Sequence, residues 1–216
     1  MSSTSSTRLK SPFLVFEGLD GSGKSTLIQL VSAELRERGL AFALTREPGG
    51  TPLAEEIRKL LLRTGHESPV ATTELLLYAA SRAQHVAKVI KPAIESGTWI
   101  LCDRFLASSV AFQSFARGLP RPEIDWLNTF AIQGAKPDLT ILLDLTVEES
   151  FRRQDGRSEK DRMESESKNF HEAVRQGYLA QAKEDPSSWL VLDARETPEV
   201  LKTKLVETLE ARGWLG

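Results

Sequence analysis

The chain has 216 residues, of which 40% are hydrophobic and 27% are charged, and it contains a single cysteine. This is the composition of a globular protein, and the length suits one domain, so disordered, collagenous and low-complexity proteins are excluded. The 28 Lys and Arg residues nearly balance the 30 Asp and Glu residues, so no general positive field would attract a nucleic-acid polymer. Cys102 alone cannot form an intramolecular disulfide, and its apolar neighbours predict a buried thiol.

The hydropathy pattern and the first residues of the chain indicate where in the cell we expect the protein to work. No stretch reaches the roughly 18 apolar residues of a membrane span, so we expect no membrane partner. Residues 1–12 (MSSTSSTRLKSP) lack the apolar segment of a secretory signal. Their Ser/Thr-rich, acid-free composition leaves a faint transit-peptide interpretation, but a disordered tail on a cytoplasmic protein explains it more simply. We expect residues 13–216 to form one domain.

Short apolar runs alternate with longer helical patterns along the rest of the chain, an order that predicts an α/β protein with a largely parallel sheet. Buried strands are predicted at Phe13–Glu17, Phe42–Arg46, Trp99–Asp103, Leu139–Leu145 and Trp189–Asp193. Helical patterns cover residues 27–35, ending at Gly39, and residues 53–63, 72–95, 123–133, 147–153, 164–184 and 198–212. Residues 152–166 (RRQDGRSEKDRMESE) are dense in both charge signs and apolar only at Met163, so we do not expect this segment in the core.

A phosphate-binding pattern lies between the first predicted strand and the first predicted helix. Residues 18–25 (GLDGSGKS) match G-x-x-x-x-G-K-[ST]. The glycines allow a tight turn whose N–H groups face phosphate oxygens, and the helix N-terminus adds its positive dipole end. Lys24 is expected to reach the β and γ phosphates of a nucleoside triphosphate, and Ser25 to bind Mg²⁺. The expected nucleotide-binding residues are Gly18, Leu19, Asp20, Gly21, Ser22, Gly23, Lys24, Ser25 and Thr26.

Mg²⁺ bound beside phosphates usually needs a carboxylate nearby, often at the end of another strand. Three predicted strands end that way, at Asp103, Asp144 and Asp193. The pattern alone does not select among them, and at least two are expected to cap neighbouring structure instead. We take Asp103 as the candidate metal ligand beside Ser25.

Three further motifs follow the phosphate-binding loop: residues 45–50 (TREPGG), 77–85 (LYAASRAQH) and 103–113 (DRFLASSVAFQ). Together with residues 121–145 and the DRMESES segment, they make the chain resemble the thymidylate kinase family, bacterial type, over about residues 13–210. The resemblance implies a P-loop nucleoside-kinase fold, a five-stranded parallel sheet flanked by helices on both faces, and a helical lid at about residues 152–166. It also implies a homodimer that transfers the γ-phosphoryl group of ATP to the 5′-phosphate of dTMP.

The resemblance also assigns an acceptor pocket. It implies that Tyr78 stacks on thymine, that Arg82 donates to a base carbonyl, and that Asp20 approaches the sugar hydroxyl. Ser108, Ser109 and Gln113 fall where the family reads the pyrimidine edge. Taken without the resemblance, Tyr78 would be interpreted as a core residue and the two serines as ordinary helix-start residues.

Close approach of two phosphate groups requires fixed cations. The resemblance implies that Arg58 and Arg104 hold the acceptor phosphate, although Arg58 alone would also suit a solvated helix face. Glu47 and Pro48 belong to the loop that shapes the acceptor pocket, and a cis bond between them is plausible. One branch of the family has an arginine where this chain has Gly21, so the transition-state cation is expected from the lid. We favour Arg153 and Arg157 for phosphate contact, and expect Arg162 to pair locally with Asp161 or Glu164; the catalytic set is then Lys24, Asp20, Arg104, Arg153 and Arg157.

Phe112 stands where the family usually has a tyrosine beside the sugar. A phenyl ring still crowds out a ribose 2′-hydroxyl but loses the hydrogen bonds of a phenol, so we expect a weaker preference for deoxyribose.

A dTMP kinase is therefore our leading hypothesis, with ATP and dTMP as substrates. A kinase for dUMP, for another pyrimidine monophosphate or for a nucleoside is the close alternative. A P-loop ATPase switch would use the same loop but leaves Arg58, Tyr78, Arg82 and Gln113 unexplained.

Overall fold

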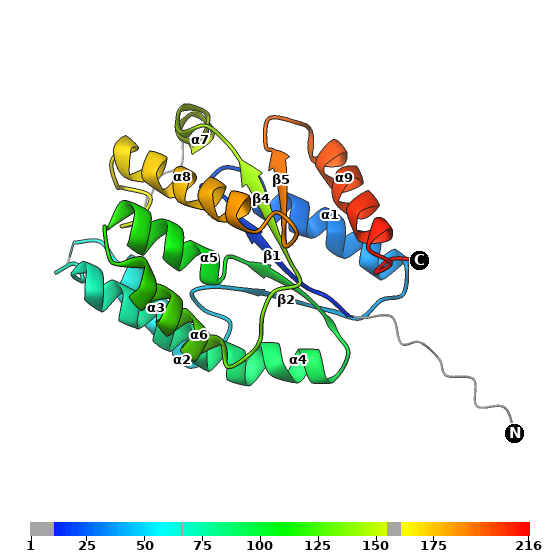
Figure 1. Ribbon diagram of the computed structural model, residues 1–216, viewed down its shortest axis with the longest axis horizontal. Helices are drawn as coiled ribbons and strands as arrows, with labels where there is room; N and C mark the ends of the chain where they lie inside the picture. The colour runs from blue at the N-terminus through cyan, green and yellow to red at the C-terminus, as the bar shows by residue number, and fades with distance from the viewer. Residues whose placement is uncertain (1–10, 66, 155–160) are drawn as a thin grey trace, which may run out of the picture.

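A parallel sheet with the strand order β2-β3-β1-β4-β5 lies at the centre of the computed structural model, which describes residues 11–65, 67–154 and 161–216 (Figure 1). All neighbouring strands pair in parallel. The strands are β1 (Phe13–Glu17), β2 (Phe42–Arg46), β3 (Trp99–Asp103), β4 (Leu139–Asp144) and β5 (Trp189–Asp193). The five predicted strands are confirmed, and β4 ends one residue earlier than expected. The edge strands β2 and β5 are only partly buried, so the expectation of burial was wrong for these two.

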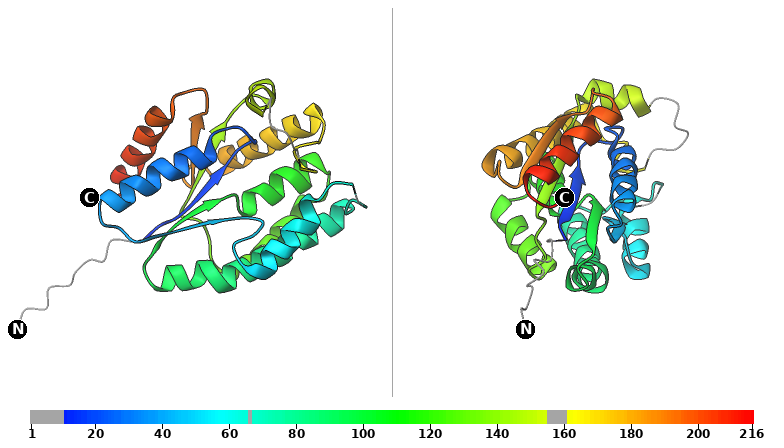
Figure 2. Two further views of the ribbon diagram at one scale, coloured as in Figure 1. Left: turned by 180° about the vertical axis from the view of Figure 1, so that it is seen from behind. Right: turned by 90° about the vertical axis from the view of Figure 1, so that its right-hand side faces the viewer.

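Helices join the strands and cover both faces of the sheet, as expected (Figure 2). They are α1 (Lys24–Glu37), α2 (Pro52–Leu62), α3 (Ala71–His85), α4 (Lys91–Glu95), α5 (Leu106–Ser109), α6 (Arg121–Ile132), α7 (Val147–Gln154), α8 (Lys168–Glu184) and α9 (Pro198–Ala211). Two π-helical segments, η1 (Val86–Ile90) and η2 (Val110–Ala116), continue α3 and α5. Helical backbone thus covers the whole predicted stretch at residues 72–95, with a π-helical segment within it, whereas the helical stretch at residues 106–116 was not predicted. No described helix is both long and apolar enough to cross a bilayer.

The side chains of β1 belong alternately to the two parts of the core, one on each face of the sheet, because successive side chains of a strand point to opposite faces. Leu14 and Phe16 pack with the apolar residues of α1 and α9, whereas Phe13 and Val15 pack on the other face with residues of η1 and β3. All four side chains are at most 1% exposed. This two-sided burial explains why β1 reads as a continuous apolar run.

The described residues of the expected lid, 152–154 and 161–166, do not belong to one helix. Helix α7 ends at Gln154, and residues 161–166 form turns. Helix α8 begins at Lys168 rather than at residue 164, because the Ser167 hydroxyl accepts a hydrogen bond from the Phe170 amide and caps the helix. Met163 is only 5% exposed and packs in a core cluster with Phe170, so excluding the whole charged segment from the core was wrong at this residue.

Two residues of the expected N-terminal tail lie against the sheet. Ser11 donates a hydrogen bond to the carbonyl of Gly97, and the carbonyl of Pro12 accepts one from the Ile100 amide. The rest of the expected tail, residues 1–10, and the candidate Arg157 lie outside the described residues.

Candidate active site

A cavity of about 410 Å³ lies where residues following β1, β2 and β3 meet. This is the carboxyl edge of the sheet, where open α/β folds place their ligands. Helix α3, the 103–113 segment and the turn at residues 161–164 complete the wall. The cavity therefore brings most of the predicted site residues together: Asp20, Gly21, Gly23, Lys24, Ser25, Thr26, Glu47, Arg58, Tyr78, Arg82, Asp103, Arg104, Ser108, Ser109, Phe112, Gln113 and Arg153.

Three predicted loop residues, Gly18, Leu19 and Ser22, do not line the cavity but lie behind it. Gly18 has a φ of 139°, and a Cβ there would lie 2.5 Å from the carbonyl oxygen of Leu143 on β4. Only glycine therefore fits between the loop and the sheet. Leu19 is 2% exposed and belongs to the core. These residues shape the loop rather than form the cavity wall.

Lys24 is buried at the start of α1. Its ammonium donates hydrogen bonds to the carbonyls of Gly18 and Leu19, at 3.0 and 2.9 Å, and lies 3.8 Å from the Asp20 carboxylate. Burial lowers the pKa of Lys24, and the nearby Arg104 adds to this effect. Lys24 is thus placed beside the loop backbone, where a bound phosphate would favour its charged form.

The structure distinguishes the three carboxylates at strand ends. Arg175 binds Asp144 through both oxygens, at 2.7 and 2.9 Å. Arg195 binds Asp193 with its side chain and its amide. Asp103 lines the cavity, and its buried Oδ1 has no hydrogen-bond partner among the described residues. The expectation that at least two of the acids serve local structure is confirmed.

An unsatisfied buried carboxylate oxygen beside a phosphate-binding loop suits a cation. The described residues contain no group of three His, Cys, Asp or Glu side chains that could hold a metal by themselves. Mg²⁺ keeps several waters and takes phosphate oxygens as ligands, so one carboxylate and one hydroxyl are a sufficient protein contribution. Asp103 and the exposed Ser25 fit that requirement.

Arg82 is the most constrained group at the far end of the cavity and is 1% exposed. Its Nε donates to Glu47 at 2.7 Å, and its Nη1 donates to Ser109 and to Asn128 at 2.9 and 2.6 Å. Its Nη2 donates to the carbonyl of Phe105 at 3.0 Å. A guanidinium has five N–H donors, so the contacts of the described residues leave one Nη2 proton for a ligand.

Arg104 and Asp20 face each other across the phosphate end, where Nη2 donates to the carboxylate at 2.8 Å. The guanidinium also donates to the Tyr178 hydroxyl at 3.0 Å and lies 5.4 Å from the Phe112 ring centroid. Burial favours the neutral acid, but the Arg104 and Lys24 charges outweigh it and hold the pKa of Asp20 well below its usual range. Arg104 has a left-handed φ of 66°, an uncommon conformation outside glycine that often marks a functional constraint.

Two side chains predicted to read the pyrimidine edge are hydrogen-bonded to buried carboxylates. The Ser108 hydroxyl donates to Glu17 at 2.7 Å, and the Gln113 Nε2 donates to Glu74 at 2.8 Å. Tyr78 also lines the cavity, and burial raises its pKa. The Tyr78 phenol is therefore neutral, as a ring that stacks on a base should be.

The remaining predicted arginines differ in their surroundings. Arg58 donates to the carbonyl of Pro48 at 2.9 Å, next to a Glu47–Pro48 bond that is cis, as suggested by the resemblance. Arg153 lines the cavity and donates to Glu149 and to the Ala194 carbonyl at 2.8 and 3.0 Å. The expected local pairing of Arg162 was wrong: the Arg162 guanidinium lies 2.7 Å from the Glu74 carboxylate and also donates to the Leu61 carbonyl.

Several buried polar residues around the cavity were not predicted. Glu17, Glu74, His85, Asn128 and Tyr178 are each at most 5% exposed. Glu17 accepts hydrogen bonds from Ser108, Tyr178 and the Phe105 amide, and His85 lies 2.9 Å from Glu47. The sequence could have indicated one of them. Glu74 lies four residues before Tyr78 and eight before Arg82, so the three side chains share one face of a helix.

Comparisons with known proteins agree with this geometry. The family model described as thymidylate kinase matches residues 16–205. The chain is 56% identical to a thymidylate kinase of Bdellovibrio bacteriovorus over 95% of this chain and 98% of that protein, and 45% identical to one of Geobacter sulfurreducens over 91% and 95%. Among solved structures, thymidylate kinase from Ehrlichia chaffeensis superposes with a TM-score of 0.71 at 31% identity, over 92% of this chain and 98% of that chain.

Proposed function

The chain belongs to the thymidylate kinase family and phosphorylates dTMP to dTDP, and we propose how its residues transfer the γ-phosphoryl group of ATP. The observation that carries this assignment is one cavity lined both by the phosphate-binding loop and by the polar residues of α3 and the 103–113 segment. A P-loop switch needs no second nucleotide pocket, so it is not favoured.

The donor triphosphate binds the loop of residues 18–26. Lys24 exchanges its contacts with the loop carbonyls for the β and γ phosphates, and the backbone N–H groups at the start of α1 bind the remaining oxygens. Ser25 and Asp103 would hold Mg²⁺, which supplies neutralisation of phosphate charge when bound. The unsatisfied Asp103 oxygen supports this assignment.

The acceptor nucleotide occupies the other end of the cavity. Tyr78 stacks on the thymine ring, and the remaining Arg82 proton donates to a base carbonyl while Gln113 binds the base edge. Ser108 and Ser109 act mainly through Glu17 and Arg82, which they contact directly. Glu47 orients Arg82, and this fixed polar pocket favours a base with matching acceptors.

The acceptor phosphate binds between Arg58 and Arg104. To reach it, Arg104 exchanges its contact with Asp20 for a phosphate oxygen, which frees the Asp20 carboxylate to accept a hydrogen bond from the sugar hydroxyl. The phosphate oxygen of dTMP then attacks the γ-phosphorus in line as the bond to the leaving ADP oxygen breaks. No protein side chain is a nucleophile in this step.

Arginines of the charged segment supply the charge that stabilises the transferring phosphoryl group. Arg153 supports this role by lining the cavity beside Gly21, and Arg157 is the second candidate. Arg153 must release its contacts with Glu149 and the Ala194 carbonyl to reach the phosphoryl group, which would occur only when ATP is bound.

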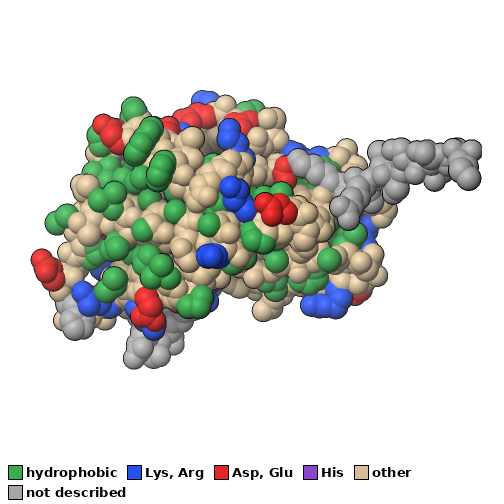
Figure 3. Space-filling view, turned by 90° about the horizontal axis from the view of Figure 1, so that it is seen from below, with side chains coloured by type: hydrophobic (Ala, Val, Ile, Leu, Met, Phe, Trp, Pro, Cys, Tyr) green, Lys and Arg blue, Asp and Glu red, His purple; other side chains and the backbone are tan. Residues whose placement is uncertain are grey.

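We also propose that the protein acts as a homodimer. Trp126 and Phe130 on α6 are 68% and 69% exposed, and their rings stack with centroids 5.8 Å apart. Leu76 on the adjacent α3 is 54% exposed. Hydrophobic side chains gather on the underside of the molecule (Figure 3), and such patches usually mark interfaces.

Three further expectations remain proposals: residues 13–216 act as one domain, the protein works in the cytoplasm, and neither a membrane nor a nucleic-acid polymer is a partner. The near balance of acidic and basic residues supports the last of these. Fractionation of the source cells tests the location.

The function is tested by measuring ADP release from ATP with a panel of nucleosides and monophosphates. We expect dTMP to give the highest kcat/KM, with dUMP and the ribose analogue lower. Equal ADP release with and without any acceptor would instead indicate an ATPase switch.

A further inference from the structure

Glu74, in the first turn of α3, is a fully buried carboxylate that does not line the cavity. Its Oε1 accepts a hydrogen bond from Gln113 at 2.8 Å and one from Arg117 at 3.3 Å. Its Oε2 accepts one from Arg117 at 3.2 Å and lies 2.7 Å from Arg162. Two guanidinium groups outweigh burial and lower the pKa of Glu74, so it is ionised. Buried charge of this kind is retained only where partners compensate it.

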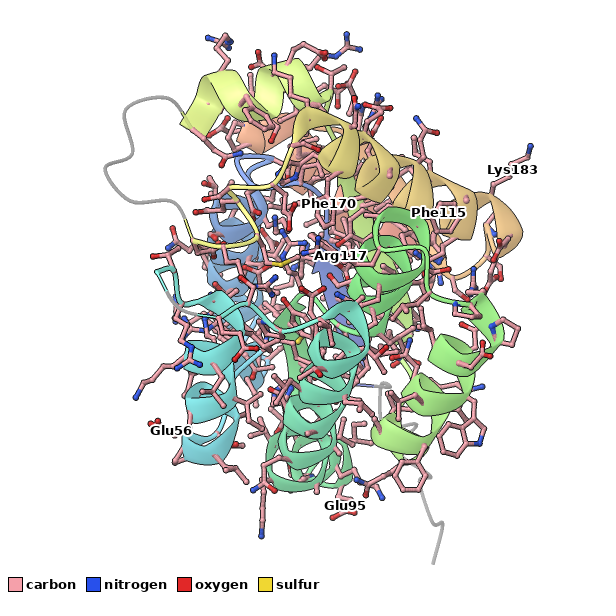
Figure 4. The ribbon with its side chains drawn as sticks, turned by 90° about the vertical axis from the view of Figure 1, so that its left-hand side faces the viewer. Glu56, Glu95, Phe115, Arg117, Phe170 and Lys183 are labelled. Carbon is pink, nitrogen blue, oxygen red and sulfur yellow. The ribbon has the colours of Figure 1, made fainter. Side chains whose placement is uncertain are left out.

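The partners of Glu74 come from segments far apart in the sequence. Gln113 and Arg117 belong to the η2 region, and Arg162 belongs to the turn at residues 161–166. Arg117 also lies 2.6 Å from Glu166 and 4.5 Å from the ring centroid of Phe170 (Figure 4). Glu74 therefore joins α3 and η2 to the turn that precedes α8.

The same turn is anchored to α2 and contributes to the cavity wall. Arg162 donates to the carbonyls of Leu61 and Leu62, through its side chain and its amide respectively. The neighbouring Met163 and Glu164 line the cavity, as does Leu62. Releasing Arg162 from Glu74 would loosen this wall.

Glu74 also fixes the orientation of an amide that lines the cavity. An ionised carboxylate only accepts hydrogen bonds, whereas a glutamine amide has an accepting and a donating side. Glu74 must therefore face the Nε2 of Gln113, which sets the direction of the Gln113 oxygen and of its second N–H. A neutral amide at position 74 would permit either orientation.

We propose that Glu74 is a positioning residue for the acceptor nucleotide, because it sets the orientation of the Gln113 amide and holds the 161–166 turn against the cavity without touching dTMP itself. The proposal rests on the proposed function, in which Gln113 binds the base. It predicts that affinity for dTMP depends on the charge of Glu74, whereas ATP binding, which uses the loop at residues 18–26, does not.

The test compares Glu74→Gln, which keeps the size of the side chain and removes its charge, with Glu56→Gln as a control. Glu56 lies on the neighbouring α2, its side chain is 66% exposed, and it pairs with Lys59. Calorimetry measures the Kd for dTMP, and steady-state kinetics measure kcat and the KM for ATP. We expect Glu74→Gln to weaken dTMP binding at least tenfold, with kcat at saturating dTMP and the ATP KM within about threefold of wild type. Glu74→Asp, which retains the charge, should recover part of the loss, and Glu56→Gln should match wild type.

Arg117→Gln and Arg162→Gln keep the test decisive if thermal melting shows that Glu74→Gln does not fold. Each should weaken dTMP binding at least threefold without changing the ATP KM. If Glu74→Gln does fold, the double variant Glu74→Gln/Arg162→Gln is also measured, and the two effects should combine to less than their product. The proposal would be overturned by an unchanged dTMP Kd in folded Glu74→Gln or, if that variant does not fold, in both arginine variants. It would also be overturned if the ATP KM rose by the same factor as the dTMP Kd. If wild type itself fails to phosphorylate dTMP, the proposed function is wrong; if only the variants behave as wild type, the inference alone is wrong.

Discussion

Two arginines at the acceptor end of the cavity, Arg82 and Arg104, are each held in place by a carboxylate. Glu47 binds Arg82, and Asp20 binds Arg104. A guanidinium held in this way is already oriented before the nucleotide arrives, so less conformational entropy is lost on binding. The consequence is that the carboxylates matter for catalysis even where they do not contact the substrate.

Arg82→Ala tests the assignment of the base pocket. It removes the donor to the base and deprives Glu47 and Asn128 of their contacts with the guanidinium. The kcat/KM for dTMP should therefore fall at least tenfold, as expected for the loss of one charged hydrogen bond. ATP affinity, measured by calorimetry, should be retained. Arg121→Ala, which breaks surface pairs with Asp125 and Glu184, is the control. Unaltered turnover in Arg82→Ala would favour the ATPase switch.

Phe112→Tyr tests the expected effect of the missing phenol. Phe112 is 8% exposed and packs against Phe170 and Tyr178 with its ring beside Arg104. A hydroxyl there should raise the ratio of kcat/KM for dTMP over its ribose analogue by a few fold, because it restores polar contacts near the sugar. Phe115→Tyr, at a 40% exposed position on η2, should leave the ratio as in wild type. A ratio that is the same in wild type and Phe112→Tyr would refute the prediction.

At the level of elements, the sequence predicted the strands and the P-loop well, because strand burial and glycine spacing are local patterns. It did not predict η1 and η2, since a π-helical segment depends on packing around an extra residue per turn. The wrong partner for Arg162 has a similar cause: Glu74 is 88 residues away, and only the fold brings the two side chains together. Likewise, Glu17 and Tyr178 meet through contacts between β1 and α8.

Gly18→Ala tests the close contact between the P-loop and β4. A methyl group would lie 2.5 Å from the Leu143 carbonyl oxygen, so the loop must shift and ATP affinity should fall at least tenfold. Gly39→Ala is a matched control, because Gly39 also has a positive φ but has open space around its Cα. This control should lower the free energy of unfolding by about 1 kcal/mol with ATP affinity unchanged. Wild-type ATP affinity in Gly18→Ala would contradict the prediction.

The buried imidazole of His171, on α8, should make the free energy of unfolding depend on pH. It is 4% exposed, its Nε2 has no hydrogen-bond partner among the described residues, and it packs edge-on against Phe151 and Phe170. Burial lowers the pKa of His171 below its ordinary value of about 6.5. Below pH 6.5 the unfolded state therefore binds a proton that the folded state does not, so the free energy of unfolding falls as pH decreases toward the folded-state pKa.

The measurement is urea unfolding at pH 7.0 and pH 5.5 for wild type and His171→Phe. Wild type should lose more stability between these pH values than the variant, which has no titrating group at this position. Equal losses would mean that His171 is accessible to protons in the folded protein.

For the whole molecule, the parallel sheet explains how residues from position 20 to position 164 meet in one cavity. All its strands end at the same edge, so the segments that follow β1, β2 and β3 converge there. Most of the predicted site residues share this cavity because their motifs follow predicted strands or lie on the helices beside them. The proposed dimer surface had no comparable signal in the sequence, because the exposure of Trp126 and Phe130 becomes visible only once the core is known.

Trp126→Glu tests the proposed homodimer. A charge on the exposed α6 face should oppose association of two copies, so sedimentation should give a dimer for wild type and a monomer for the variant. Glu123→Gln, on the same helix, is the control and should sediment as wild type. Identical sedimentation of wild type and Trp126→Glu would exclude this face as the interface.

In the proposed mechanism, ATP and dTMP occupy one cavity together and in separate halves. The decisive experiment titrates dTMP into the protein already saturated with a non-hydrolysable ATP analogue and Mg²⁺. We expect one dTMP bound per chain, with an affinity reduced by Arg82→Ala and no displacement of the analogue. Competition between the two nucleotides for a single site would contradict it.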